Sequence, residues 1–140
     1  MVEVENIGHY LKSKSIRPSL QRIRILEYLI KNRNHPTVEM IYNELLCDMP
    51  TLSKTTIYNT LKLFVENNVA IVINIEDNET RYDADTSIHG HFKCNECEGV
   101  FDFNVDVNML QFMGLDGFMI SEHHIYLKGV CRVCKSKELA

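Results

Sequence analysis

The sequence lacks the segments that direct a chain into or across a membrane. No uninterrupted apolar run approaches the roughly 20 residues that span a bilayer. No charged stretch followed by an apolar one, as in a secretory leader, stands near its start. We therefore expect a cytoplasmic protein with no membrane partner.

The sequence also lacks the common signatures of catalysis. It contains no helical His-Glu-x-x-His motif, no glycine-rich phosphate-binding loop, and no serine or cysteine nucleophile paired with a base. A metal-dependent hydrolase that uses histidine and aspartate is the enzyme alternative that remains. We expect that the protein is not an enzyme.

Cysteine is scarce, but four of the five cysteines form two matched pairs, Cys94–Cys97 and Cys131–Cys134. Two residues between cysteines let both thiolates face one point, and four soft sulfur ligands suit tetrahedral Zn²⁺. We predict one structural zinc site. Two disulfides, an iron centre with the same sulfur count and redox-active thiols are the alternatives. We expect the fifth cysteine, Cys47, to be a small buried residue near the end of a helix.

The formal net charge of −4 is unevenly distributed. Residues 1–70 hold nine Lys and Arg against seven Asp and Glu, whereas residues 71–140 hold six against twelve. A mildly basic first half can face a phosphate backbone, and an acidic second half offers carboxylates to cations. With 140 residues and 45% hydrophobic content, the chain can form one ordinary core or two small ones.

Helical periodicity dominates the first half. Ser19, Thr37 and Ser53 each stand before an apolar pattern with helical spacing, so we predict three helices with these residues as N-caps. Prolines lie close to each of these starting points, which favours breaks in the chain between the helices.

The last of these helices, residues 53–64, has two different faces. One face is apolar and consists of Ile57, Leu61 and Phe64. The other carries groups that can donate hydrogen bonds to phosphates and base edges: Lys54, Thr55, Tyr58, Asn59 and Lys62. A plain amphipathic helix with a solvated face would show the same pattern. Its place after a capped helix and a proline turn, and before a hairpin, favours a DNA recognition helix.

A β-hairpin is predicted directly after this helix. Residues 69–75 alternate and are rich in β-branched side chains, Asp77–Asn78 favours a turn, and residues 80–82 form the returning strand. Helices followed by such a two-stranded wing make up a winged helix-turn-helix.

The second half is predicted to contain strands at 92–94, 100–103 and 118–127, around one helix from Asp106 to Met113. The predicted fold is therefore α+β, with a winged-helix DNA-binding domain over residues 1–83. A small α/β domain for dimerisation and metal binding, with the four-cysteine zinc site, follows over residues 84–140. We expect a homodimer, because a DNA reader built from half-sites needs two copies.

A second group of potential metal ligands surrounds the boundary between the predicted domains. It comprises His35, Asp83, Asp85, His89, His91 and Asp102. In an extended segment, residues i and i+2 face the same side, so His89 and His91 can bind one ion. Imidazole and carboxylate ligands together suit Fe²⁺ or Mn²⁺ better than four thiolates do. The alternative is a set of ordinary polar side chains beside a hinge.

Taken together, these motifs resemble the ferric-uptake-regulator family of metal-dependent repressors over nearly the whole chain. The segments that carry the resemblance are residues 35–37, 56–61, 81–83, 89–97, 102–103 and 129–134. The resemblance implies double-stranded operator DNA as the partner. It also implies structural Zn²⁺ at the paired cysteines and a separate regulatory Fe²⁺ or Mn²⁺.

Within the family, the chain is most similar to the peroxide-responsive branch. Repressors of this branch bind their regulatory metal through three histidines and two aspartates, and the matching positions are His35, Asp83, His89, His91 and Asp102. Iron-uptake repressors usually have glutamate at the position of Asp102, and further histidine and acidic residues where this chain has Ile88 and Gly90. Asn59 also matches the peroxide branch, since iron-uptake repressors often have arginine there.

The resemblance implies a mechanism of sensing. Five ligands leave one position of a six-coordinate Fe²⁺ open to H₂O₂, and oxidation of His35 or His89 to 2-oxo-histidine would weaken metal binding. The repressor would then release its operator, whereas Mn²⁺ would hold the DNA-binding shape without that oxidation. The alternative is an iron- or zinc-uptake repressor of the same family that responds to metal supply.

Overall fold

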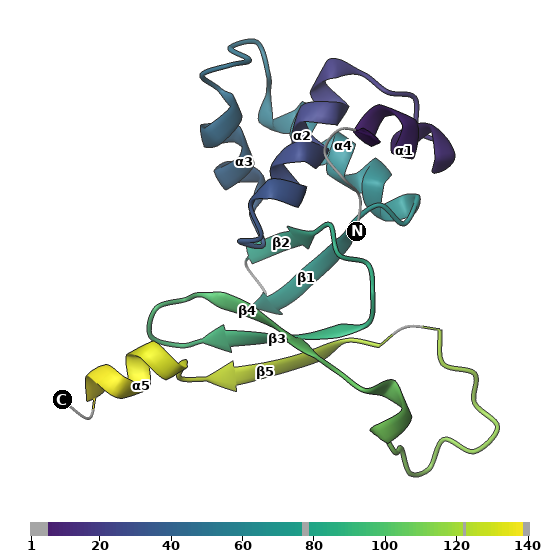
Figure 1. The fold of residues 1–140 in the computed structure, drawn as a ribbon, viewed down its shortest axis with the longest axis vertical. Coiled ribbons are helices and arrows are strands. Elements are labelled where there is room, and N and C mark those ends of the chain that lie inside the picture. Colours follow the sequence, from purple (N-terminus) through teal and green to yellow (C-terminus); the bar gives the residue numbers. More distant parts are fainter. Residues whose placement is uncertain (1–5, 77–78, 122, 139–140) are drawn as a thin grey trace. The chain divides into compact units, whose positions relative to one another are not determined.

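The computed structural model describes residues 6–76, 79–121 and 123–138. The chain divides into two compact units, residues 1–86 and 87–140, whereas we expected the division after residue 83. The first unit is mainly helical, and the second is built around a small sheet (Figure 1). Among the described helices, none is long and apolar enough to cross a membrane.

The first unit contains, within its described residues, a bundle of helices followed by an antiparallel hairpin. The helices are α1 (Ile7–Ser13), α2 (Leu20–Lys31), α3 (Val38–Leu45) and α4 (Lys54–Glu66), and the strands are β1 (Ile71–Glu76) and β2 (Glu79–Asp83). Helices α3 and α4 with the β1–β2 wing form the predicted winged helix-turn-helix. The turn predicted at Asp77–Asn78 lies outside the described residues.

The three predicted N-caps are confirmed. The side-chain oxygens of Ser19, Thr37 and Ser53 accept hydrogen bonds from the backbone N–H groups three residues later, at 3.2, 3.2 and 3.1 Å. Each cap satisfies a donor that the first turn of a helix leaves without an intrahelical partner, which stabilises the helix by about 1 kcal/mol. These local contacts determine where α2, α3 and α4 begin.

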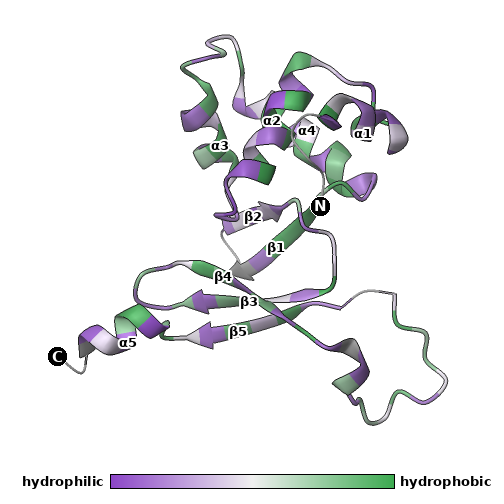
Figure 2. Cartoon of the chain, viewed as in Figure 1, coloured by the Kyte–Doolittle hydropathy of each residue, from purple (hydrophilic) through white to green (hydrophobic). Residues whose placement is uncertain are grey.

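The core of the first unit lies between its four helices. Ile57, Leu61 and Phe64 of α4 are fully buried there, as their helical spacing predicted. Figure 2 shows hydrophobic and hydrophilic stretches alternating along α2, which is typical of a helix with one buried face. Full burial of each such side chain contributes about 1.5–3 kcal/mol. The core therefore fixes which face of α4 remains outside.

The second unit contains a three-stranded sheet in the order β4–β3–β5. The strands are β3 (His89–Cys94), β4 (Val100–Asn104) and β5 (Ile125–Gly129). Strand β3 pairs antiparallel with β4 and parallel with β5. Parallel neighbours need a long crossover, which accounts for the long interval between the two cysteine pairs. A short helix that the sequence did not predict, α5 (Arg132–Glu138), follows β5.

The predictions for residues 106–127 are wrong in two places. The helix expected from Asp106 to Met113 is only a 3-10 turn, η2 (Val107–Met109). The Asp106 carboxylate does cap this turn, since it accepts a hydrogen bond from the Asn108 N–H at 3.0 Å. The strand expected over residues 118–127 is limited to β5.

The composition of the segment between η2 and β5 explains this difference. Most of its large hydrophobic side chains are exposed, so they contribute no burial that would stabilise a helix or a strand here. Gly114 and Gly117 have φ values of +85° and +80°, which interrupt both kinds of regular structure. Hydrophobic spacing in the sequence was therefore not sufficient for the predicted helix and strand to form.

Cys47 also differs from the prediction, because it is exposed. It lies in the turn after α3, whose last residue, Leu45, is buried. The chain has left the core at that point. Cys47 is therefore available as a thiol that belongs to neither cysteine pair.

Replacing Leu61 with alanine is expected to lower the free energy of unfolding by about 3 kcal/mol, because the change removes buried contacts and leaves a cavity. The matched control is Leu20→Ala, since the Leu20 side chain is 67% exposed. We expect that control to change the free energy by less than about 0.5 kcal/mol. Denaturant unfolding followed by circular dichroism measures both variants. Equal losses would contradict the position of Leu61 in the core.

Candidate metal centres and nucleic-acid interface

Strand pairing brings the two cysteine pairs of the second unit together. The parallel register places Cys94, at the end of β3, beside Gly129, at the end of β5. The Asn95 N–H also donates to the Gly129 carbonyl at 2.8 Å. Cys131 follows directly after this point, and Cys134 lies three residues further, on the first turn of α5. Both pairs therefore reach the same end of the sheet.

The sulfur atoms form one compact group. All four Sγ atoms lie within 4.8 Å of one another, and those of Cys97 and Cys131 are 3.9 Å apart. A tetrahedral zinc ion with Zn–S bonds of about 2.3 Å places its sulfur ligands about 3.8 Å apart. The described cysteines form no disulfide. The sulfur donors and their spacing therefore fit a single Zn²⁺.

Backbone hydrogen bonds favour the thiolate form at this site. The Cys131 N–H donates to Cys94 Sγ at 3.4 Å. This bond, together with one from the Cys97 N–H, lowers the pKa of the Cys94 thiol to about 6. A thiol with that pKa is mostly thiolate at neutral pH, and the thiolate is the form that binds metal. Backbone N–H groups from both cysteine pairs thus prepare Cys94 to bind a cation.

A second potential centre begins with His35 and Asp83 in the first unit. The Tyr82 N–H donates to the Pro36 carbonyl at 3.0 Å, which ties β2 to the segment before α3. His35 Nε2 then lies 3.5 Å from Asp83 Oδ2, and both side chains are buried. The Asp85 N–H donates to Asp83 Oδ1 at 2.9 Å and so orients the carboxylate.

The second unit brings together His89, His91 and Asp102. The antiparallel register of β3 and β4 places His91 opposite Asp102 and His89 opposite Asn104. Asp102 Oδ1 lies 3.3 Å from His91 Nε2 and 3.5 Å from His89 Nε2. These residues are direct and diagonal neighbours on one face of the sheet. His89 Nδ1 contacts the Ser87 carbonyl at 2.7 Å, which orients the ring with Nε2 toward the carboxylate.

Gly90, between the two histidines, is required by packing. It stands opposite Phe103 of β4, and a Cβ atom at residue 90 would lie 2.0 Å from the Phe103 ring. Any larger residue would have to displace that ring. The phenyl ring therefore occupies the space that a side chain at residue 90 would fill.

The two imidazole–carboxylate groups both fit a divalent cation. Two donor atoms at right angles and about 2.1 Å from one ion lie about 3 Å apart. The N···O separations within the groups are 3.3–3.5 Å. Neutral imidazoles and carboxylates suit Fe²⁺ and Mn²⁺. Asp85 differs from the other candidates, because its carboxylate lies 3.5 Å from the Arg33 guanidinium and so forms an ion pair.

The polar face predicted for α4 is exposed along its whole length. Its members are Lys54, Thr55, Tyr58, Asn59 and Lys62. Lys54 already has partners, since its Nζ lies 2.8 Å from Glu39 Oε2 and 5.2 Å from the centre of the Tyr42 ring. The hydrogen bond to Glu39 raises the pKa of Lys54. A phosphate would therefore have to compete with the Glu39 carboxylate for this ammonium group.

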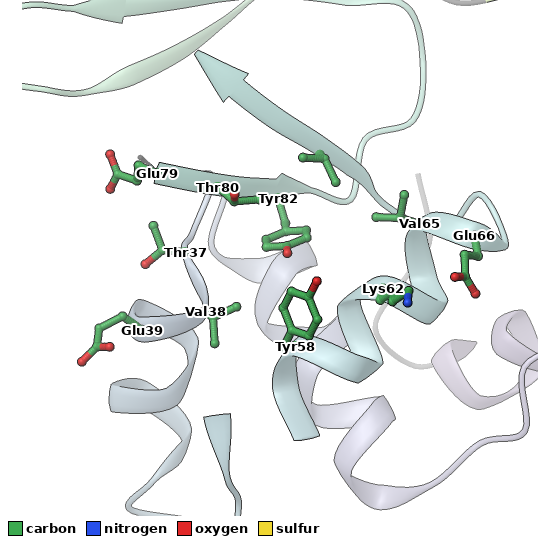
Figure 3. Close-up of a pocket in the computed structure, with 11 residues that line it drawn as sticks. Thr37, Val38, Glu39, Tyr58, Lys62, Val65, Glu66, Glu79, Thr80 and Tyr82 are labelled. Carbon is green, nitrogen blue, oxygen red and sulfur yellow. The ribbon is translucent and has the colours of Figure 1, made fainter. Parts of the chain in front are cut away.

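A pocket of about 790 Å³ adjoins this face, between α4, the start of α3 and β2. Tyr58 of α4 and Tyr82 of β2 both line it, and Figure 3 shows Lys62 on the next turn of α4. Helix α4 and the β1–β2 hairpin thus enclose one concave surface. Such a surface can follow the edge of a DNA groove.

The sequence patterns indicated no role for two residues that shape these sites, Arg81 and Phe103. Arg81 stands two positions before Asp83 and therefore lies on the same face of β2. This two-residue spacing was visible in the sequence. Phe103 covers Gly90, but this pairing depends on the register of β3 and β4, which sequence spacing alone does not determine.

Known proteins resemble this chain over nearly its full length. The model of the ferric uptake regulator family matches residues 13–128. The peroxide-responsive repressor PerR of Staphylococcus aureus strain Mu50 is 33% identical over 146 aligned positions. That alignment covers 97% of this chain and 99% of the relative.

Solved structures agree with this result. A structure of PerR from Streptococcus pyogenes, described as a basis for peroxide sensing and gene regulation, is 29% identical with a TM-score of 0.55. The match covers 96% of this chain and 94% of that one. The ferric uptake regulator of Vibrio cholerae is 24% identical with a TM-score of 0.74, and the match covers 89% of this chain and 98% of that one. The second likeness concerns the fold alone.

Replacing Cys94 with serine is expected to reduce bound zinc from one ion per chain to nearly none, because three sulfur ligands cannot close a tetrahedral site. The second unit should lose its fold as well, since metal affinity in such sites is folding free energy. Metal analysis and circular dichroism measure the two effects. Cys47→Ser is the matched control and should keep its zinc. A folded, zinc-free Cys94→Ser protein would contradict a structural role for the site.

Proposed function

Because the chain belongs to the ferric uptake regulator family, we propose that it is a metal-dependent transcriptional repressor that senses hydrogen peroxide and then releases its operator. The observation that carries the proposal is the ligand set. The first unit holds His35 beside Asp83, and the second holds two histidines beside Asp102. Sequence identity of 33% to a peroxide-responsive repressor supports the same branch.

We propose that His35, Asp83, His89, His91 and Asp102 bind one regulatory Fe²⁺ or Mn²⁺. The aspartate at residue 102 supports the peroxide branch, because a carboxylate on this shorter side chain leaves more room beside the ion than a glutamate would. The packing of Phe103 against Gly90 supports it as well, since it leaves no space for an additional ligand at that position. Zn²⁺ belongs to the four cysteines and has a structural role.

The imidazoles are the groups that change during sensing. Bound Fe²⁺ supplies the one-electron chemistry by which H₂O₂ oxidises a neighbouring side chain. The net change is the addition of one oxygen atom to the carbon between the two ring nitrogens of His35 or His89, while the second oxygen of the peroxide leaves as water. The product, 2-oxo-histidine, is a poor ligand. The modified histidine therefore ceases to hold the cation.

Loss of one ligand affects DNA binding through linkage. The proposed ligands come from both units of the chain, so the cation favours the arrangement in which both contribute. If that arrangement also binds DNA best, metal binding raises the affinity for the operator and operator binding raises the affinity for the metal. Oxidation of a histidine then lowers the affinity for the operator.

We propose that the protein acts as a homodimer through its second unit. Large hydrophobic residues are exposed in its described part: Met109, Phe112, Met113, Leu115, Phe118, Met119 and Ile120. Exposed apolar surface of this extent is typical of an interface between chains. A second copy that covers it would provide two α4 helices for the two half-sites of an operator.

A repressor of this kind binds chromosomal DNA in the cytoplasm and is not an enzyme.

The exposed face of α4 is proposed to read double-stranded operator DNA. Tyr58→Ala should remove operator preference while metal content stays unchanged, because Tyr58 and Asn59 are the candidates for base contact. Lys62→Ala should weaken binding to all sequences alike and flatten the salt dependence by about one unit, because it removes one phosphate contact. Fluorescence anisotropy with operator and scrambled duplexes measures both. Full operator discrimination by Tyr58→Ala would mean that another face docks on DNA.

Exposure to H₂O₂ should distinguish the two metal forms. The Fe²⁺-loaded protein is expected to gain one oxygen, about 16 Da, on a peptide that contains His35, His89 or His91, and to release its operator. The Mn²⁺-loaded protein should do neither. Intact and peptide mass spectrometry, with operator binding measured in parallel, report the two effects.

Asp102→Glu is the matched variant for that experiment. Its longer side chain should keep metal-dependent DNA binding but lose much of the peroxide response, because it reaches one methylene further and crowds the space that peroxide needs. Equal resistance to peroxide in the Fe²⁺ and Mn²⁺ forms of the unmodified sequence, with no oxidised histidine, would instead favour an iron- or zinc-uptake repressor.

A further inference from the structure

His35 has a backbone conformation that its residue type rarely adopts. Its φ is +51°, in the left-handed region that favours glycine. A residue that precedes proline, as His35 precedes Pro36, ordinarily takes an extended conformation. Such a strained backbone persists only where surrounding contacts hold it.

Two hydrogen bonds from β2 hold this segment. Arg81 Nη1 donates to the His35 carbonyl at 3.1 Å, and the Tyr82 N–H donates to the Pro36 carbonyl at 3.0 Å. The other arm of the guanidinium donates to Glu79 Oε1 at 3.1 Å. The Arg81 side chain is only 15% exposed. The planar, forked shape of the guanidinium lets one side chain bind both acceptors at once.

The same strand also carries the carboxylate that faces the histidine. Arg81 and Asp83 are two residues apart on β2 and so lie on one face of the hairpin. Arg81 holds the His35 backbone, while Asp83 Oδ2 lies 3.5 Å from His35 Nε2. Both residues pair with β1, opposite Ile73 and Ile71. The histidine is therefore attached to the wing through backbone and side chain.

We propose that Arg81 is the positioning residue of the regulatory metal centre, because it presets His35 and Asp83 for one divalent cation and connects that pair to the wing. Arg81 acts through the His35 backbone and is not itself a ligand. The inference rests on the proposed function, which assigns His35 and Asp83 to the metal. A guanidinium that only tied the chain to the sheet would affect folding and leave the coordination of the metal unchanged.

The test compares Mn²⁺ binding by the full-length, zinc-loaded protein with that of three variants. Arg81→Met should weaken the affinity about tenfold or more, as is usual for groups that orient a metal ligand. Arg81→Lys should recover part of the loss, since an ammonium can reach the His35 carbonyl without the second arm. Arg24→Met is the matched control, because Arg24 forms an ion pair with Asp48 at 2.7 Å on the surface of the same unit. It should bind Mn²⁺ like the unmodified protein.

Spectroscopy separates positioning from general stability. At saturating Mn²⁺, the electron spin echo of the bound ion reports its coupling to ligand ¹⁴N, and Arg81→Met should show one imidazole fewer than the unmodified protein. Its zinc content, and its Tm in the zinc-loaded form without Mn²⁺, should equal those of Arg24→Met. The positioning role would be overturned if both Arg81 variants lost affinity in step with a lower Tm of this Mn²⁺-free form while the nitrogen count stayed unchanged.

Two further outcomes distinguish this inference from the function on which it rests. Unchanged Mn²⁺ affinity and an unchanged nitrogen count in Arg81→Met would overturn the role of Arg81 and leave the proposed function intact. Absence of Mn²⁺ binding by the unmodified protein would overturn both.

Discussion

The pairing of β3 with both of its neighbours is the constraint on which the chemistry of the second unit depends. Its antiparallel register with β4 places His91 opposite Asp102, and its parallel register with β5 places Cys94 beside Gly129. A slip of one residue would turn the histidines to the other face of the sheet and separate the cysteine pairs. Metal bound to either group would oppose that slip, so the strand register and the metal centres stabilise each other.

The β1–β2 hairpin has a role in the first unit comparable to that of β3 in the second. One of its faces presents Arg81 and Asp83 to His35, and the hairpin also forms the wing beside α4. Helix α4 is held by a core in which Ile57, Leu61 and Phe64 are fully buried, and this leaves its polar face outside. The strand that carries Asp83 and the helix with the exposed polar face thus belong to one small, well-packed unit. This arrangement gives the proposed linkage between metal and operator a short physical route.

Local interactions made much of the first unit predictable. An N-cap needs only a side chain and a backbone N–H three residues away, so Ser19, Thr37 and Ser53 indicated the starts of three helices correctly. Residues 106–127 were not predictable in this way. Their apolar spacing suggested a helix and a long strand, but those elements require a surface on which to bury their hydrophobic side chains, and Met109 and Met113 are exposed. Helix α5 was not predicted for a different reason. It is so short that its hydrophobic residues do not repeat often enough to show helical spacing.

The sequence by itself determined which ligand types are present. Paired cysteines predict a soft, four-sulfur site through their spacing. The resemblance to the family implies that three histidines and two aspartates are the ligands of a harder one. The tertiary structure alone decided how those ligands meet. Cross-strand register gave Asp102 two histidine neighbours, the ring of Phe103 closed the space beside Gly90, and Arg81 held His35 in a left-handed backbone. These contacts join residues far apart in the chain, and such contacts follow from packing and strand register, which local sequence patterns do not encode.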